Sequence, residues 1–550
     1  MHRNHQNRIR QQILSLVFLI TTLHATNVSR KKTFEKEIPA KSGATLIIED
    51  SRGDLNIEGT DGNKIFVRAF LGVKNGDREM VEKYLEYSTL ELEKTSDGAT
   101  LAFHTPEDEE DRSLLDTFVR HLEKLIEEGK WRISVTRRMN VQVPLNQNLI
   151  VQNKYGNVSV QNINGQLEIK NQSGEVRISD CGGHLDLKNS YAAVSVDDFK
   201  GTVKLRNSSG EVNLDRIQGS TEIENSYRSV TLNQIGGDCI IQSSSAEING
   251  RNIGGNCSVR SSYRPITISD VKGSLDVNGS SAAVTALRVA GHVEIESSYR
   301  DIKVDSVGKD LAVKGSSASV TASRINGSAS IRSSYRSIKI EDVNGSIDID
   351  GSSCSVEAIS IKGDASIKTS YREINLEDIS GRVEVHGSSA PVIATNLGGS
   401  AVIQSSYKPI QVRNIKHNLE VDGSSCPVSV ENVGGDLEVT NSYKYVIVKG
   451  TSGSVMIHGS SSPIEVTEVK QIPEDGKVEL TTTYKSIILI LPKRINASID
   501  AKTKNGKIRI DLPENQMVAD GKEGIGFNTG TGDIPILLRT DKDITIGENK

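Results

Sequence analysis

Short runs of alternating apolar and polar residues recur along most of this chain, in the same register every 18 residues. With the first residue of each unit called position 1, positions 4, 6, 9, 13 and 15 are apolar in nearly every unit. In the unit that begins at Tyr263 they are Ile266, Ile268, Val271, Leu275 and Val277. This alternation predicts two half-buried strands per unit, near positions 4–6 and 13–15. Gly near position 11 and Gly-Ser or Ser-Ser at positions 17–18 predict corners.

Position 1 alternates between Tyr and Ser, so that the full period is 36 residues. The tyrosines, each 36 residues after the last, are Tyr155, Tyr191, Tyr227, Tyr263, Tyr299, Tyr335, Tyr371, Tyr407 and Tyr443. Midway between them, starting at Ser173 and ending at Ser461, a serine stands every 36 residues.

An 18-residue unit is too small to bury a core alone, so its apolar positions must be covered by neighbouring units. Stacked coils would fuse these positions into columns, with parallel backbone ladders about 4.8 Å apart. The pattern therefore predicts an all-β fold, a parallel β-solenoid (β-helix-like) with 18-residue coils in a 36-residue alternating double repeat.

The alternation also extends to the expected core. Position 6 is large in Tyr units, as in Ile340 and Leu376, and Ala in the four Ser units between 281 and 398, as in Ala358 and Ala394. Large and small layers would interdigitate to the density of a protein interior. We therefore expect the tyrosines to be structural corner residues that fill the space between layers: Tyr227, Tyr263, Tyr299, Tyr335, Tyr371, Tyr407 and Tyr443.

The ends of the chain depart from the repeat. Strand-like alternation begins in residues 43–73 and is interrupted by two helical segments, 77–87 and 111–129, which we expect to be an α-helical insertion or cap. A docking role for the second helix is an alternative. We expect a signal peptide at 1–25, N-terminal strands with the helical insertion at 26–140, solenoid repeats at 141–490 and irregular strands closing the solenoid at 491–550.

The first 25 residues resemble an export signal. Arg3, Arg8 and Arg10 precede the apolar run ILSLVFLI (13–20), and Ala25 is a suitable cleavage point. An uncleaved anchor is the alternative. No later segment is apolar enough to span a bilayer. We expect an exported protein that is periplasmic, associated with the cell envelope or extracellular. The net charge of −5 does not favour nucleic acid as a partner.

Five cysteines do not form a disulfide framework in a chain of 550 residues. Cys239 and Cys257 occupy position 13 of successive coils, about 4.8 Å apart by the strand spacing and within disulfide range. Two packed thiols and a disulfide both fit this placement, and we favour packed thiols.

Candidate catalytic chemistry is sparse in the repeats. Acidic residues such as Asp270, Asp342 and Asp378 follow the period and are expected at solvated corners, and no cofactor motif is present. His386 and His458 are four coils apart and cannot share a metal ion. We therefore expect no catalytic residues, no metal site, no cofactor and no enzymatic activity. The alternative is a carbohydrate-active solenoid enzyme with its site in the irregular N-terminal region.

A basic residue follows the tyrosine on alternate coils. These residues, which we call the basic stripe, are Arg228, Arg264, Arg300, Arg336, Arg372, Lys408, Lys444 and Lys485. Each arginine could stack on its own tyrosine, or the stripe could be a linear site for an anionic ligand. The candidate partners are an acidic envelope polysaccharide and another envelope protein.

Several segments resemble the putative-adhesin family, bacterial β-strand-repeat domains of unknown function. The similar segments are GDLNIEGTDGNKIFVRA (53–69), VKGSLDV (271–277), NGKIRIDLP (505–513) and GTGDIPI (530–536). The resemblance implies an exported β-solenoid. Together these features predict a structural or adhesin-like envelope protein.

Overall fold

The computed structural model describes residues 28–76, 78–106, 133–512, 515–520 and 524–549. The expected signal peptide and the expected helix at 111–129 lie outside these residues. The chain divides into an N-terminal unit that ends at Asn225 and a C-terminal unit that begins at Ser226.

The N-terminal unit holds fourteen strands and one described helix. They are β1 (Val28–Pro39), β2 (Thr45–Arg52), β3 (Asp54–Thr60), β4 (Lys64–Gly76), α2 (Arg78–Glu86), β5 (Thr89–Lys94), β6 (Gly98–His104), β7 (Ser134–Pro144), β8 (Asn148–Tyr155), β9 (Val158–Gln161), β10 (Asn164–Asn171), β11 (Val176–Asn189), β12 (Val194–Asn207), β13 (Val212–Ile217) and β14 (Thr221–Asn225).

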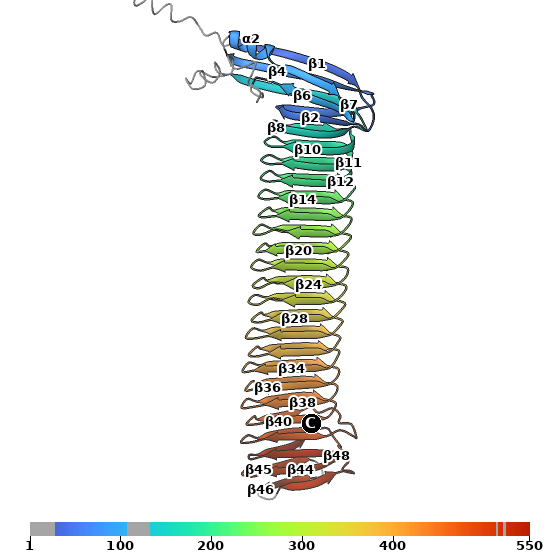
Figure 1. The fold of residues 1–550 in the computed structure, drawn as a ribbon. Helices are drawn as coiled ribbons and strands as arrows, with labels where there is room; N and C mark the ends of the chain where they lie inside the picture. Colours follow the sequence, from blue (N-terminus) through green and yellow to red (C-terminus); the bar gives the residue numbers. More distant parts are fainter. Residues whose placement is uncertain (1–27, 77, 107–132, 513–514, 521–523, 550) are drawn as a thin grey trace, which may run out of the picture. The chain divides into compact units, whose positions relative to one another are not determined.

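Mixed pairing gives way to parallel coils within this unit. Strand β4 runs antiparallel to β1 and β7, and β5 runs antiparallel to β6. From β8 onward, β10 pairs in parallel with β8 and β11, and β12 pairs in parallel with β11 and β13. Helix α2 confirms the prediction of a helix near 77–87, and it buries Val81 and Tyr84 next to β4 and β1 (Figure 1).

The C-terminal unit contains only strands among its described elements. The first group is β15 (Val230–Ile235), β16 (Cys239–Ser243), β17 (Ile248–Ile253), β18 (Cys257–Arg260), β19 (Ile266–Val271), β20 (Leu275–Ser280), β21 (Val284–Val289), β22 (Val293–Ser297), β23 (Ile302–Val307), β24 (Leu311–Lys314), β25 (Val320–Ile325), β26 (Ala329–Arg332), β27 (Ile338–Val343), β28 (Ile347–Gly351), β29 (Val356–Ile361), β30 (Ala365–Thr369), β31 (Ile374–Ile379) and β32 (Val383–Gly387). The second group is β33 (Val392–Leu397), β34 (Ala401–Ser406), β35 (Ile410–Ile415), β36 (Leu419–Ser424), β37 (Val428–Val433), β38 (Leu437–Asn441), β39 (Val446–Thr451), β40 (Val455–Gly459), β41 (Ile464–Thr467), β42 (Val478–Thr482), β43 (Ile487–Leu491), β44 (Ala497–Thr503), β45 (Lys507–Leu512), β46 (Asn515–Asp520), β47 (Ile525–Thr529), β48 (Ile534–Thr540) and β49 (Ile544–Glu548).

The predicted parallel β-solenoid is confirmed. Each coil has two strands, and each strand from β15 to β39 pairs in parallel with the strand 18 residues later, as Ile266 with Val284 and Val284 with Ile302. In Figure 1 the coils of the C-terminal unit, coloured from green to red, follow one another in a regular stack. The first strand of each coil is longer than predicted, because it continues from position 4 to position 9.

The longer strand contains a kink that the hydrophobic pattern did not indicate. Positions 7 and 8 both point outward, as Ser269 and Asp270 do in β19, and position 8 has a positive φ in coil after coil. The values include 58° at Asp270, 57° at Asp342 and 59° at Asn396. Asn and Asp tolerate this left-handed conformation better than most residues, which explains their frequency at position 8.

Alternating layers build the core of the C-terminal unit, as predicted. Ile340 and Leu376 are fully buried at position 6, and so are Ala358 and Ala394 in the intervening coils. The last strands add a closing arrangement: β48 pairs in parallel with both β42 and β44, and β45 pairs with β46 in an antiparallel ladder. Strand β48 therefore lies between β42 and β44, although it follows both in the sequence.

The predicted packing role of tyrosine is wrong. In the C-terminal unit the tyrosines at position 1 are between 61% and 71% exposed, so they do not fill space between layers. The small residue after the serine packs inside instead, at position 2 of the Ser coils. Ala282, Ala318 and Cys354 are fully buried there.

A buried hydroxyl or amide at position 17 stabilises this inner corner. Ser297 Oγ donates a hydrogen bond to the carbonyl of Ala282 at 2.7 Å, and Thr369 Oγ1 donates to the carbonyl of Cys354 at 2.9 Å. Asn441 occupies the same place and donates through Nδ2. These side chains satisfy carbonyls that the strand ladders leave open, which is the usual requirement for buried backbone groups.

The cysteines are packed side chains, as favoured from the sequence. Cys239 and Cys257 face each other in the ladder between β16 and β18, and their hydrogen bond together with burial raises the pKa of Cys257 well above its ordinary value. Burial raises the pKa of Cys181 and of Cys426 to about 11. A buried protonated thiol is a poor nucleophile.

We expect iodoacetamide at about pH 8 to modify the cysteines only after denaturation. The pKa of Cys181 is about 11 in the native protein, against 9.0 for an ordinary thiol. The buried, protonated thiol therefore contributes to stability below pH 9, and this contribution is lost as the pH rises from 9 to about 11. Urea titrations at several pH values give the free energy of unfolding of the unmodified protein and of Cys181→Ala. The difference between the two free energies should change with pH over this interval. Rapid labelling of Cys181 in the native protein, or a pH-independent difference, would contradict the assignment.

Candidate functional site

The basic stripe lies entirely in the C-terminal unit and on its surface. All eight side chains are exposed, at position 2 of the Tyr coils. The 18-residue register places equivalent positions of successive coils above one another, as shown by the pairs Ile338 with Val356 and Val356 with Ile374. Neighbouring stripe residues are therefore two coils apart, about 9.6 Å at the usual strand spacing.

A tight turn presents the tyrosine and the cation together. The backbone N–H of Arg264 donates to the carbonyl of Ser262 at 2.9 Å, and Tyr263 between them has φ of 70°. An i to i+2 hydrogen bond with positive φ at the centre defines a strained form of γ-turn. The same turn recurs at Tyr371, Tyr407 and Tyr443, with φ of 69°, 63° and 67°.

The stripe cations from Arg264 onward are weakly engaged by the protein itself. Arg336 Nη1 lies 3.9 Å from Asp301 Oδ1, an exposed ion pair of the kind that contributes little stability. The stacking of arginine on its own tyrosine is not found for Arg264, Arg300, Arg336 or Arg372. The cation-over-ring contacts of the described residues involve Phe34 and Phe66. Consecutive side chains of a tight turn project in different directions, which separates the two groups.

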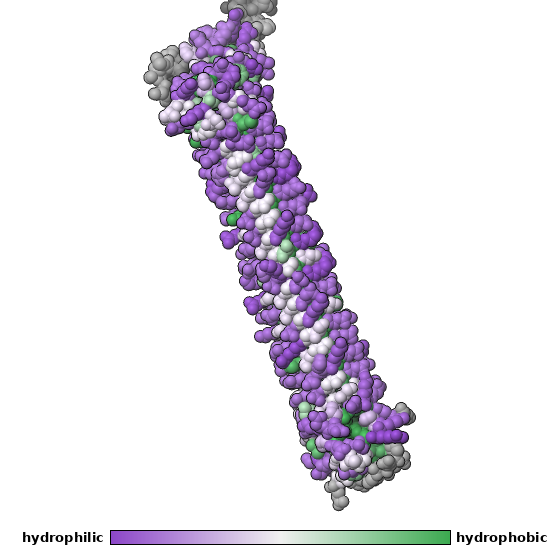
Figure 2. Space-filling view, turned by 90° about the vertical axis from the view of Figure 1, so that its right-hand side faces the viewer, coloured by the Kyte–Doolittle hydropathy of each residue, from purple (hydrophilic) through white to green (hydrophobic). Residues whose placement is uncertain are grey.

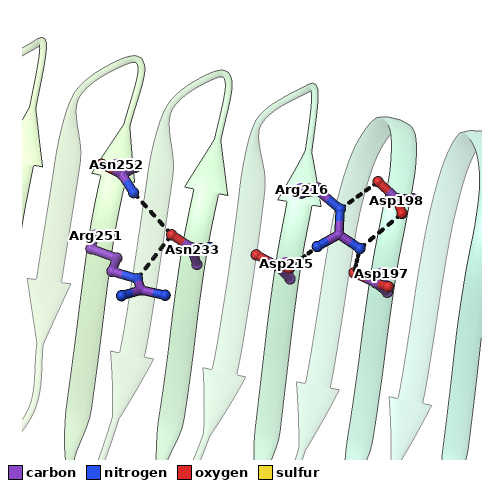
Figure 3. A network of polar contacts seen from close by, with 7 residues as sticks. All are labelled: Asp197, Asp198, Asp215, Arg216, Asn233, Arg251 and Asn252. Carbon is purple, nitrogen blue, oxygen red and sulfur yellow. Dashed lines mark hydrogen bonds and ion pairs between the residues drawn. The ribbon is translucent and has the colours of Figure 1, made fainter.

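Charged clusters elsewhere brace neighbouring coils. Figure 3 shows Arg216 surrounded by Asp197, Asp198 and Asp215, and its side-chain hydrogen bond with Asp198 lowers the pKa of that carboxyl. Arg288 makes a bidentate ion pair with Asp270 one coil away, at 2.6 and 2.8 Å. The expectation of a solvated corner at Asp270 is wrong: this residue lies at the kink inside β19, is half-buried, and its carboxylate is paired with Arg288.

The histidines also serve local contacts. His386 Nδ1 lies 2.9 Å from Gln404 Oε1, and its Nε2 lies 2.8 Å from Glu384 Oε1. His458 Nδ1 lies 2.8 Å from Thr481 Oγ1. Among the described residues, no group of three His, Cys, Asp or Glu side chains is arranged to hold a metal ion.

A polar ladder at position 12 was missed by the sequence reasoning. Asp238 Oδ1 accepts from the backbone N–H of Asn256 at 2.7 Å, and Asn256 Oδ1 accepts from that of Ser274 at 2.9 Å. Asp310 and Asp364 do the same for the coils that follow them. The frequent Asp, Asn or Ser after the glycine was the signal, since these side chains readily bond to nearby backbone groups.

Two open grooves follow the outside of the coils. One, of about 720 Å³, is walled by carboxylates such as Glu294 and Glu384 over a floor that includes Ala312 and Ser330. Its Asp310 and Asp364 belong to the position 12 ladder. The other, of about 660 Å³, follows a ladder of amides in which Asn432 Nδ2 donates to Asn414 Oδ1 at 3.0 Å.

The visible surface is mainly polar. Figure 2 shows a largely hydrophilic face, crossed by a pale band of intermediate hydropathy, with apolar residues in scattered spots. No helix among the described residues has the length and apolar character needed to cross a membrane.

A family model described as Toastrack DUF4097 matches residues 20–251. This match confirms the predicted resemblance to an adhesin-like repeat family of unknown function. No curated protein matches the chain.

Three solved structures show some likeness. A putative cell adhesion protein from Clostridium sporogenes is 11% identical, with 48% of this chain and 100% of that chain covered and a TM-score of 0.17. A putative adhesin from Parabacteroides merdae is 11% identical, with 68% and 96% covered and a TM-score of 0.14. A putative adhesin from Parabacteroides distasonis is 15% identical, with 66% and 97% covered and a TM-score of 0.15.

Proposed function

We propose that this chain is an exported, non-enzymatic, adhesin-like protein whose basic stripe binds an anionic polymer of the cell envelope. The observation that carries the proposal is the stripe itself: eight exposed cations in one register, on alternate coils of a rigid stack. A fixed linear array of like charges attracts an extended polyanion more strongly than scattered charges do.

The cost of the array supports a binding role. Like charges about 9.6 Å apart repel one another at ordinary ionic strength, since the Debye length is about 8–10 Å. The internal ion pairs of the protein do not relieve this repulsion for Arg264, Arg300 or Arg372. An extended polyanion would neutralise the whole stripe at once.

The non-enzymatic part of the proposal rests on the roles found for the acidic side chains. Asp270 is occupied by Arg288, and Asp310 and Asp364 hold backbone N–H groups of the next coil. Carboxylates used in this way are parts of the stack rather than general acids or bases. The resemblance to an adhesin-like family is in keeping with a binding function.

Retention on immobilised acidic polysaccharide at low and high salt tests the proposal. We expect the unmodified protein to bind at low salt and to elute as salt rises. A variant with all eight stripe residues changed to Ser should bind roughly tenfold or more weakly.

A matched pair of variants distinguishes the effect of the stripe on binding from the effect of net charge. One changes Arg264, Arg300, Arg336 and Arg372 to Ser, and the other changes four exposed lysines outside the stripe: Lys272, Lys309, Lys362 and Lys416. Each loses the same charge, and only the first should weaken retention. Equal retention of both, or salt-insensitive binding, would rule out the stripe as the binding site.

A further inference from the structure

We infer that the exposed tyrosines form a stacking platform for sugar rings, and that the ligand is an acidic polysaccharide with one acidic sugar in each disaccharide. This inference rests on the proposed function and names its ligand class. The features that would recognise this ligand are the tyrosine at each γ-turn, the cation beside it, and the distance from one turn to the next.

Several of the tyrosines adopt a backbone conformation that is unfavourable for a bulky residue. A φ near 70° at Tyr263 and Tyr443 lies in the left-handed region, where glycine or asparagine is favoured and a bulky residue is strained. Packing does not compensate for the strain, because the rings are 71% and 68% exposed. Strained residues that persist without a packing reason are typical of functional sites.

Small residues surround the tyrosine rings along the stack. The position between two tyrosines is occupied by a half-buried serine on the intervening coil, such as Ser317 between Tyr299 and Tyr335. Because serine is small, we expect it to leave the faces of the neighbouring exposed rings accessible. The apolar face of a sugar ring fits against an aromatic face of this kind, and tyrosine adds a hydroxyl that can hydrogen-bond.

The distance between successive tyrosines matches the length of a disaccharide. Equivalent tyrosines are two coils apart, about 9.6 Å at the strand spacing. A β-linked disaccharide in an extended chain has nearly this length. Successive disaccharides would therefore meet successive tyrosines in the same way along the stripe.

Charge density distinguishes this ligand from other polyanions. The stripe offers one cation per about 9.6 Å, whereas a nucleic acid strand carries one phosphate per about 3.4 Å. A polysaccharide with one carboxylate per disaccharide matches the stripe charge for charge. The denser polyanions would leave most of their charge facing a protein of net charge −5.

Glycine substitutions at the tyrosines test the inference. We expect changing the five tyrosines with positive φ, Tyr263, Tyr371, Tyr407, Tyr443 and Tyr484, to Gly to weaken binding of hyaluronan, a polymer of alternating acidic and neutral sugars, at least tenfold. The unfolding midpoint should not fall, because glycine adopts positive φ freely. A milder variant changes only Tyr263, Tyr371, Tyr407 and Tyr443 to Asn, which also tolerates this conformation.

The outcomes separate this inference from the proposed function. Unchanged hyaluronan binding by both tyrosine variants, with binding lost in the stripe variant, would overturn the platform and leave the stripe intact. A lower unfolding midpoint in the Asn variant would also overturn it, because the rings would then be structural. Failure of both the tyrosine and the stripe residues to affect binding would remove the proposed function as well.

Competing polymers complete the test. We expect hyaluronan to bind at least tenfold more tightly than polyphosphate, single-stranded DNA or a neutral β-linked glucan of equal length. Equal or tighter binding of polyphosphate would show that charge alone is recognised. Preference for DNA would point to base stacking on the tyrosines, and preference for the glucan would exclude a role for the acid; each would overturn the inference.

Discussion

Replacing Leu376 with Ala is expected to lower the free energy of unfolding by about 2–5 kcal/mol, the usual cost of a cavity at a fully buried leucine. Leu376 is 0% exposed, and its ladder neighbours are Ala358 and Ala394. Two small neighbours cannot expand into the space that the leucine leaves. The cavity should therefore persist rather than collapse.

The neighbouring coil provides the matched control. Ala394→Leu adds volume to a layer that is already complete, and overpacking of this kind costs about 1–3 kcal/mol. The double variant Leu376→Ala with Ala394→Leu conserves volume across the two coils, so it should be more stable than the sum of the single changes predicts. Urea unfolding, monitored by far-ultraviolet circular dichroism, measures the free energy of unfolding of the two single variants and the double variant. Simple additivity would contradict the layered packing.

The sequence was sufficient to predict the fold because the repeat itself carries the information. Eighteen-residue spacing places Ile266, Val284 and Ile302 in one column, and a column of apolar residues can be buried only by parallel stacking. The large and small layers at position 6 followed from the same spacing. The helix near 77–87 was also predicted, and it is found as α2.

The corners could not be predicted from hydrophobicity. Tyr263 and Ala282 occupy neighbouring positions of equivalent corners, yet the tyrosine points to solvent and the alanine is buried. What decides between them is backbone conformation: a γ-turn in one coil and an inner corner, bonded by Ser297, in the next. The apolar character of the tyrosine ring suggested burial, and the left-handed turn overrides it.

The basic stripe was predictable in its placement and not in its contacts. Constant spacing was enough to put Arg264 and Arg300 on one face of the C-terminal unit. The stacking of arginine on its own tyrosine, one of the two interpretations of the stripe, is not found for Arg264, Arg300, Arg336 or Arg372. This contact depends on side-chain directions within a turn, which the repeat pattern does not define. The position 12 ladder, with Asp238 and Asn256, likewise depends on which backbone groups the parallel strands leave open.

The dependence of affinity on ligand length tests most directly whether the stripe is a continuous binding track. The protein would be titrated with hyaluronan fragments of increasing length, and the dissociation constant would be measured for each by calorimetry. Each added disaccharide should reach one more tyrosine and cation, so the affinity should rise up to about sixteen sugars, two per stripe residue. Linked contacts of this kind can raise affinity by about 10²–10⁴ over a single contact. An affinity that stops rising at four sugars, or the absence of binding at every length, would contradict the account.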